Sequence, residues 1–230
     1  MRLALFSVSY AGLWGQAVLG VCEFIEKAAR LGYGGVMLAG KRPHLSPLDA
    51  TPGQSVAALW PRVVAALREC CDRAAAHGVT VAVQNHHDLA VHTAALLELL
   101  ADIDRPNCKL GFDAWSPALR GEDLYEAARR AAPHAVLTTN ADYVRLPRFQ
   151  YQPAQVNYQP AAPDLVRAVP FGEGFIDYPA FFRGLRDGGF DGVAAYEMCS
   201  PLRGGGAVEN LDRCAELYLK WMRENVPATP

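Results

Sequence analysis

The chain has 230 residues, enough for a sizeable core, and we expect one domain over residues 1–230. Hydrophobic residues make up 51% of the chain and charged residues 20%, which indicates a globular protein rather than a disordered one. The net charge of −2 argues against a protein that binds nucleic acid through its phosphates, and no apolar run reaches the roughly 18 residues that a membrane span needs.

The chain alternates strand and helix patterns from its start. The stretch 3–9 predicts a first strand better than it predicts a signal peptide. In order, the first half predicts strand 3–9, helix 18–31, strand 35–39, helix 56–77, strand 79–84 and helix 93–100. Between the second strand and the long helix, residues 40–54 form a loop rich in proline and glycine.

The second half continues the alternation after one interruption. It predicts strand 109–113, helix 122–131, strand 135–140, a helix that begins near Asp177 and ends at Gly188, strand 193–196 and helix 209–224. Residues 141–170 show no clear period, are rich in Arg, Tyr, Gln and Pro, and are expected to form a long loop without regular structure.

Alternating strands and helices predict an α/β protein with a parallel sheet. Neither GxGxxG nor GxxxxGK[ST] follows a strand, so the nucleotide-binding folds lack their phosphate loop. We therefore expect a TIM-barrel-like parallel β/α barrel. Only about six of the eight βα units are recognisable, so the barrel is expected to be abbreviated, with two units missing between about Gly40 and Trp60. An open barrel exposes strand edges, which allows a homo-oligomer.

The six cysteines form no CxxC pair, and we expect them to be reduced in a cytoplasmic protein.

Four expected strands end on polar residues, which are Gln84, Asp113, Thr139 and Glu197. The carboxyl ends of barrel strands hold the chemistry of such folds, so these side chains should surround one point. Oxygen donors suit a hard divalent cation such as Mg²⁺ or Mn²⁺, which would polarise a sugar carbonyl while a carboxylate moves the neighbouring proton. Asp113 and Glu197 would then be ligands, and Glu197 also the acid or base.

Plainer interpretations stay open for each residue. Asp113 and Glu197 could cap helices, and Gln84 could be a satisfied buried amide. Further candidates are His86 as a second base, and His44, Trp115, Arg145 and Arg148 as substrate-binding residues. His44 could equally be a structural loop residue, Trp115 a packing residue and the arginines a solvated surface.

Several segments resemble the sugar phosphate isomerase/epimerase family, the xylose isomerase-like TIM barrels. They are Gly32-Tyr33-Gly34-Gly35-Val36, Val83-Gln84-Asn85-His86, Gly111-Phe112-Asp113, Asp142-Tyr143, Gly172-Glu173-Gly174-Phe175-Ile176-Asp177, and Gly189-Phe190-Asp191-Gly192 leading to Tyr196-Glu197. The last two are the most specific. The resemblance implies eight strands and a divalent metal (Mg, Mn or Zn) held by Glu, Asp, His and Glu, with the two glutamates exchanging the substrate proton.

Two positions depart from that implied ligand set. The first Glu falls on Gln84, which is no general base, and the His falls on or near Thr139, a poorer ligand. The sequence therefore predicts a metal-assisted isomerase, epimerase or related dehydratase that acts on a sugar, sugar phosphate or cyclitol. The alternative is a non-catalytic sugar-binding or degenerate relative. The endonuclease IV-like branch of the fold is disfavoured by the net charge.

Overall fold

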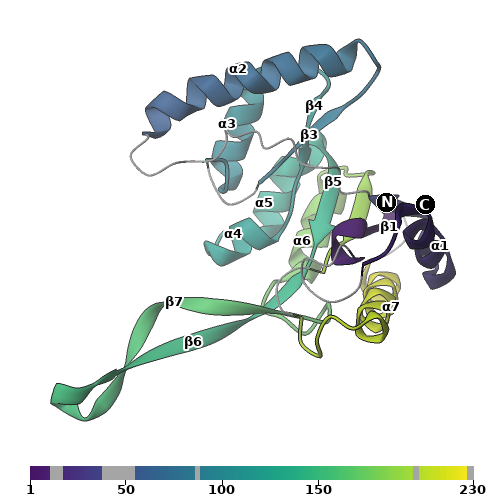
Figure 1. Cartoon of the computed structure of the whole chain (residues 1–230). Coiled ribbons are helices and arrows are strands. Elements are labelled where there is room, and N and C mark those ends of the chain that lie inside the picture. The colour runs from purple at the N-terminus through teal and green to yellow at the C-terminus, as the bar shows by residue number, and fades with distance from the viewer. Residues whose placement is uncertain (11–17, 38–54, 86–88, 199–201, 227–230) are drawn as a thin grey trace.

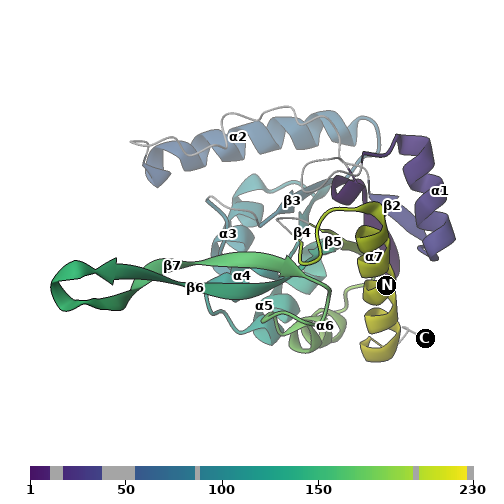
Figure 2. The same ribbon diagram turned by 60° about the horizontal axis from the view of Figure 1, so that its bottom comes forward.

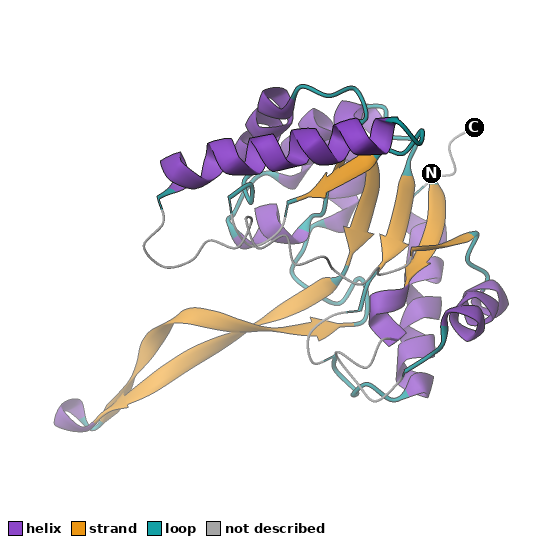
Figure 3. Ribbon diagram, turned by 45° about the horizontal axis from the view of Figure 1, so that its top comes forward, coloured by secondary structure: helices purple, strands orange, loops and turns teal. Residues whose placement is uncertain are grey.

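The computed structural model describes residues 1–10, 18–37, 55–85, 89–198 and 202–226. Six strands form one parallel sheet in the order β2-β1-β8-β5-β4-β3 (Figure 1). They are β1 (Arg2–Phe6), β2 (Gly35–Met37), β3 (Val81–Gln84), β4 (Cys108–Gly111), β5 (Ala135–Asn140) and β8 (Val193–Tyr196). All five pairings between neighbouring strands are parallel, as the alternating pattern predicts, and Figure 3 shows the middle strands of the sheet side by side.

Helices connect the strands of the sheet, because neighbouring parallel strands need a long crossover between them. They are α1 (Val21–Leu31), α2 (Val56–Ala75), α3 (Thr93–Ile103), α4 (Trp115–Leu119), α5 (Leu124–Ala131), α6 (Tyr178–Asp187) and α7 (Val208–Asn225). Their ends use the expected residues: Asp177 accepts a hydrogen bond from the Ala180 amide at 2.9 Å, and Gly32 ends α1 with a φ of 90°. The short helix α4 was not expected from the sequence.

One face of the sheet is packed against α6 and α7. Phe112, beyond β4, stacks on Phe181 of α6 with ring centroids 5.9 Å apart, and Tyr196 of β8 stacks on Tyr218 of α7 at 4.7 Å. These rings are buried and form much of the core. Packing on this face leaves the alternate residues of each strand pointing to the other face.

The sheet is open within the described residues. Its end strands are β2 and β3, which are consecutive strands in the chain and would be separated by two further strands in a full barrel. The abbreviated TIM-barrel-like fold is therefore confirmed. Residues 38–54, which span most of the region where the missing units were expected, lie outside the described part of the chain.

The expectation of a loop without regular structure over residues 141–170 is wrong. Strands β6 (Asp142–Gln152) and β7 (Asn157–Val169) pair antiparallel from end to end except for a bulge between Leu146 and Arg148, and a short 3₁₀ turn at 153–155 joins them. This hairpin, here called the arm (residues 142–169), leaves the carboxyl end of β5 and projects well away from the rest of the chain (Figures 1 and 2). Both its strands are edges, so its prolines break no sheet interior.

Candidate functional site

The strand register places the expected site residues on one face of the sheet. Gln84 pairs with Gly111, Gly111 with Leu137, and Thr139 with Ala195. Paired residues project to the same face, and so do residues two apart on one strand. Asp113 lies two residues beyond Gly111, and Glu197 two beyond Ala195. All four side chains therefore leave the face opposite α6 and α7, at the carboxyl ends of their strands.

Three of the four side chains are joined by hydrogen bonds. The Gln84 amide nitrogen donates to Asp113 Oδ2 at 3.1 Å and to Thr139 Oγ1 at 2.7 Å. Asp113 and Thr139 are each 5% exposed, and Gln84 is half-buried. The prediction that polar residues at the ends of separate strands meet at one point is borne out for these three.

Burial dominates the electrostatics of Asp113. It raises the pKa of this carboxyl from 3.8 to about 6, against hydrogen bonds from the Ser116 amide, Gln84 and the Trp115 amide, which lower it. The two backbone amides donate to Oδ1, at 2.8 Å from Trp115 and 3.3 Å from Ser116. Asp113 thus accepts from the first amides of α4, as the plainer interpretation expects, and presents its other oxygen to Gln84.

Glu197 continues the parallel ladder past the end of β8, because its amide donates to the Asn140 carbonyl at 3.0 Å. This bond fixes the backbone from which the half-buried side chain projects. The next residue is also held, because the Met198 amide donates a hydrogen bond to Ser9 Oγ at 2.8 Å. The strand end that carries Glu197 is therefore anchored on both sides.

An aromatic wall stands beside Asp113. Trp115 packs on Tyr143 with ring centroids 3.9 Å apart and on Phe175 at 6.4 Å. The guanidinium of Arg145 lies 4.5 Å from the centre of the Phe175 ring. Two expected substrate-binding residues, Trp115 and Arg145, are thus brought together by the base of the arm, where flat rings and a cation suit a polyhydroxylated substrate.

The remaining expected residues are placed less closely. Arg148 lies farther out on the arm and is exposed. His44 and His86 lie outside the described residues.

Sequence reasoning missed the residues that support this site. Asn85 accepts from the Asp113 amide at 2.8 Å and donates to its carbonyl at 2.9 Å, so it locks the chain around Asp113. Ser116 donates to the Asn85 carbonyl at 2.7 Å. Asn85 lies in one of the segments that carry the resemblance, and Ser116 follows Trp115, but the sequence indicates a role for neither. Tyr143 lies in one of the segments that carry the resemblance, but nothing in the sequence indicates its contact with Trp115.

The donor set suits a weakly held hard cation at best. All four side chains offer oxygen, which Mg²⁺ and Mn²⁺ accept. Yet no group of three or more His, Cys, Asp or Glu side chains that could hold a metal is found among the described residues. The Gln84 amide nitrogen also points at the two oxygens that a metal would need. A half-turn of that amide would present its oxygen instead, since the two orientations have nearly the same shape.

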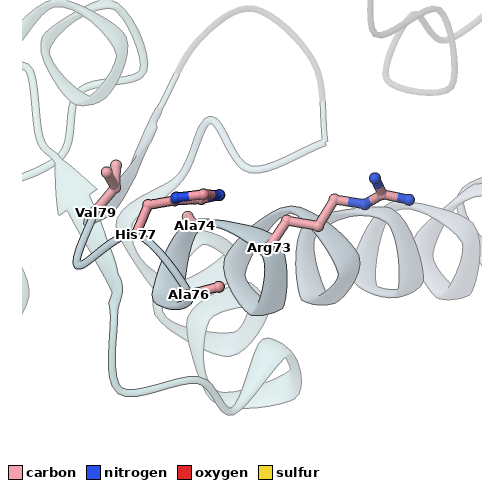
Figure 4. A pocket seen from close by; sticks show the side chains of 5 residues that line it. All are labelled: Arg73, Ala74, Ala76, His77 and Val79. Carbon is pink, nitrogen blue, oxygen red and sulfur yellow. The ribbon is translucent and has the colours of Figure 1, made fainter.

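A separate surface hollow of about 520 Å³ lies at the end of α2 and is lined by Arg73, Ala74, Ala76, His77 and Val79 (Figure 4). These residues precede β3, so the hollow is at the amino end of that strand and not at the end that carries Gln84. The active sites of barrel enzymes lie at the carboxyl ends. The hollow therefore plays no part in the candidate site.

The family model described as xylose isomerase-like TIM barrel matches residues 13–224. A 3-dehydroshikimate dehydratase of Bacillus anthracis is 27% identical over 127 residues, which are 53% of this chain. The match spans 43% of that relative's length.

Solved structures share the fold over nearly the whole chain. A D-allulose 3-epimerase from Methylomonas sp. in complex with D-allulose superposes with a TM-score of 0.72 at 13% identity, covering 98% of this chain and 97% of that one. The probable 3-DHS dehydratase involved in petrobactin synthesis from Bacillus anthracis gives 0.66 at 16% identity, covering 97% and 100%. At such identities the likeness establishes the fold. No helix among the described residues is long and apolar enough to cross a membrane.

Proposed function

Because the chain belongs to the xylose isomerase-like TIM barrel family, we propose that it moves a proton next to the carbonyl group of a sugar, a sugar phosphate or the keto form of a cyclitol. The observation that carries the proposal is the meeting of Gln84, Asp113 and Thr139 on the face from which Glu197 projects. The solved structures that share the fold include a D-allulose 3-epimerase and a probable 3-DHS dehydratase, and the names of both describe reactions of this kind.

The roles of the side chains follow from their charge and position. Glu197 is the base that takes the proton from the carbon beside the carbonyl, and its half-buried position keeps it within reach of a bound molecule. Thr139 accepts from Gln84, which leaves its hydroxyl proton to donate to a substrate oxygen. Trp115, which is half-buried and backed by the buried Tyr143, supplies the wall against which the apolar face of a ring packs.

This set favours reactions that need one base. Inversion of a carbon by epimerisation uses one group on each side of that carbon, and Gln84 is no base in the position where the resemblance implies the second glutamate. Among the described residues, the site therefore supports an aldose–ketose isomerisation or the loss of water from a hydroxy-carbonyl compound better than an epimerisation. His86 stays a prediction as a second base.

A divalent cation stays part of the proposal. Asp113, Glu197, Thr139 and the turned amide of Gln84 would hold it, and when bound it would polarise the substrate carbonyl. With two neutral groups among four ligands, we expect weak, exchangeable binding. A cytoplasmic location and reduced cysteines are likewise proposed; five cysteines are free among the described residues.

Proton exchange into substrate tests the proposal without knowledge of the product. The protein is incubated in D₂O with D-allulose, D-fructose, D-tagatose or 3-dehydroshikimate, with and without Mn²⁺, and deuterium beside the carbonyl is followed by NMR. Exchange should occur with at least one compound and fall by at least about 100-fold in Glu197→Gln. The matched control, Asp191→Asn at an exposed position, should keep full exchange.

Two results would contradict the proposal. Exchange that survives in Glu197→Gln removes Glu197 as the base. Binding of a sugar by calorimetry without any exchange supports the alternative of a non-catalytic sugar-binding relative.

A further inference from the structure

The backbone of Asp113 lies beyond the ladder that joins β3 and β4. The last pair of that ladder is Gln84 with Gly111, and Asp113 follows two residues later. Its side chain is 5% exposed, so the peptide groups that carry it lie in the interior. Because buried peptide groups are almost always hydrogen-bonded, the N–H and the C=O of Asp113 need partners from outside the ladder.

The side chain of Asn85 supplies both partners. Its Oδ1 accepts from the Asp113 amide at 2.8 Å, and its Nδ2 donates to the Asp113 carbonyl at 2.9 Å. One of these backbone groups can only donate and the other can only accept, so the Asn85 amide has a single orientation. Asn85 is fully buried, at 0% exposure. Its carboxamide therefore holds Asp113 as a peptide group of a neighbouring strand would.

Asn85 also holds the turn that binds the carboxylate. Its backbone carbonyl accepts from Ser116 Oγ at 2.7 Å, and Ser116 is buried as well. The amides of Ser116 and Trp115 are the two groups that donate to Asp113 Oδ1. One residue thus fixes both the backbone that carries the carboxylate and the amides that bind one of its oxygens.

This bracket leaves one oxygen of Asp113 for the site. Since Oδ1 is taken by two amides, the carboxylate presents Oδ2 on the site face, where Gln84 Nε2 lies 3.1 Å away. Gln84 and Asn85 are consecutive residues, so the same short stretch of chain sets the spacing between the Gln84 and Asp113 side chains. A displacement of about 1 Å in such a group can cost on the order of 100-fold in rate.

We propose that Asn85 is a positioning residue, which holds the Asp113 carboxylate in one rotamer with Oδ2 directed at the substrate. The inference rests on the function proposed above. Asn85 touches neither the substrate nor the moving proton. It acts through Asp113 alone, by the two bonds of its side chain and by the bond from its carbonyl to Ser116.

The chain offers a matched control at the other end of the same two strands. Asn107 precedes β4 directly, and its Nδ2 donates to the carbonyls of Cys71 at 2.8 Å and Val79 at 3.1 Å. Like Asn85, it makes two side-chain hydrogen bonds to backbone groups. These bonds lie at the amino ends of β3 and β4, away from the carboxyl ends that carry the site.

The test compares Asn85→Leu with Asn107→Leu in the deuterium exchange assay, using the compound that exchanges fastest. Leucine has nearly the shape of asparagine but makes neither bond. Per folded protein, measured by circular dichroism, Asn85→Leu should lower kcat about 100-fold with KM within about threefold of wild type. Asn107→Leu should keep both constants within about threefold of wild type. Ser116→Ala, a smaller change that removes one bond to Asn85, should lower kcat about 10-fold.

The rotamer of Asp113 separates a failure of this inference from a failure of the proposed function. Three-bond NMR couplings across its Cα–Cβ bond, measured without substrate, should show one χ1 rotamer in wild type and in Asn107→Leu. In Asn85→Leu they should show an average over several rotamers. A wild-type chain that exchanges no proton contradicts the proposed function, and the couplings then decide the role of Asn85 by themselves.

Two results would overturn the inference. One is a single Asp113 rotamer in Asn85→Leu, and the other is a kcat for Asn85→Leu that equals that of Asn107→Leu. If Asn85→Leu does not fold, Ser116→Ala decides instead, because an unchanged kcat together with a single Asp113 rotamer in that variant would show that the bracket does not position the carboxylate.

Discussion

The site face of the sheet and the arm are made of the same kind of strand but are held in different ways. In the sheet, Gln84, Asp113 and Thr139 come from three strands, and each position is fixed by register, by burial and by hydrogen bonds. In the arm, two strands pair only with each other, and the residues beyond the base are largely exposed. The strands of the sheet are thus stabilised by burial and by side-chain hydrogen bonds, whereas the outer arm is stabilised by little more than the pairing of its two strands.

The sheet and the arm meet at Asp142, where we expect the largest effect of a single substitution on stability. Its buried carboxylate accepts from the amides of Tyr143 at 2.9 Å, Gly172 at 3.0 Å and Gly174 at 2.8 Å, which closes the base of the arm. Asp142→Ala should lower the free energy of unfolding by about 3–5 kcal/mol, since several buried donors lose their acceptor. Urea denaturation measures it. Asp164→Ala, at an exposed arm position, should change stability by less than about 0.5 kcal/mol. Equal effects would mean that arm and sheet are not held differently.

The second prediction concerns the pH dependence of stability on the site face. The pKa of Asp113 is raised from 3.8 to about 6 in the folded protein, so the folded state binds this proton more tightly than the unfolded state. The stabilisation is fully present below about pH 4 and is lost as the pH rises through about 6.

Asp113→Asn removes that titration. Measured in EDTA, the variant should gain about 2–3 kcal/mol relative to wild type between pH 4 and pH 7, because two pKa units correspond to about 2.7 kcal/mol. The Gln84 amide can turn over to accept from the new amide, so the hydrogen bond is kept. A difference between the two proteins that does not vary with pH would show that Asp113 is not buried as described.

The variant Gln84→Glu tests whether the same side chains hold a divalent metal. Without metal, the new carboxylate faces Asp113 at hydrogen-bond distance, and the free energy of unfolding should fall by about 1–2 kcal/mol from the repulsion. With Mn²⁺ the variant should instead be more stable than the wild type. Calorimetry should show that the variant binds Mn²⁺ at least about 10-fold more tightly than the wild type. Gln84→Leu is the control, which should lose both effects. Mn²⁺ binding that is the same in all three proteins would place the metal elsewhere.

The contrast also explains what could be predicted from the sequence. The six parallel strands show as short apolar runs, most clearly where both faces are largely buried, as in β4 and β8, and their polar ends mark the site. The arm shows no such run, since strand residues that face water on both sides need no apolar period. Its Pro147, Pro153, Pro160 and Pro163 also suggest a loop. Pairing between β6 and β7 is a contact between distant residues, and the register that joins Phe149 to Pro160 leaves no local signal.

The hydrogen bonds of the site were only half predictable. That Gln84, Asp113 and Thr139 converge follows from their common place at strand ends, because parallel strands bring these ends to one edge of the sheet. That the Gln84 amide bridges the other two depends on side-chain rotamers and on burial, which a sequence pattern does not specify. The aromatic wall depends on the arm, so an error about residues 141–170 also hid the contact between Trp115 and Tyr143.

The smallest expected effect lies at the contact between arm and site wall. Arg145 sits over the Phe175 ring at 4.5 Å, and a cation over a ring at an exposed position is worth about 0.5–1 kcal/mol. A double-mutant cycle of Arg145→Met with Phe175→Leu, in which each change keeps most of the apolar surface, should give a coupling energy of that size in urea denaturation. The control cycle, Arg148→Met with Phe175→Leu, should show none, because Arg148 lies beyond the bulge that follows Leu146. Equal couplings would mean that the outer arm also packs on its own body. The division between a self-supporting sheet and an unsupported arm would then be wrong.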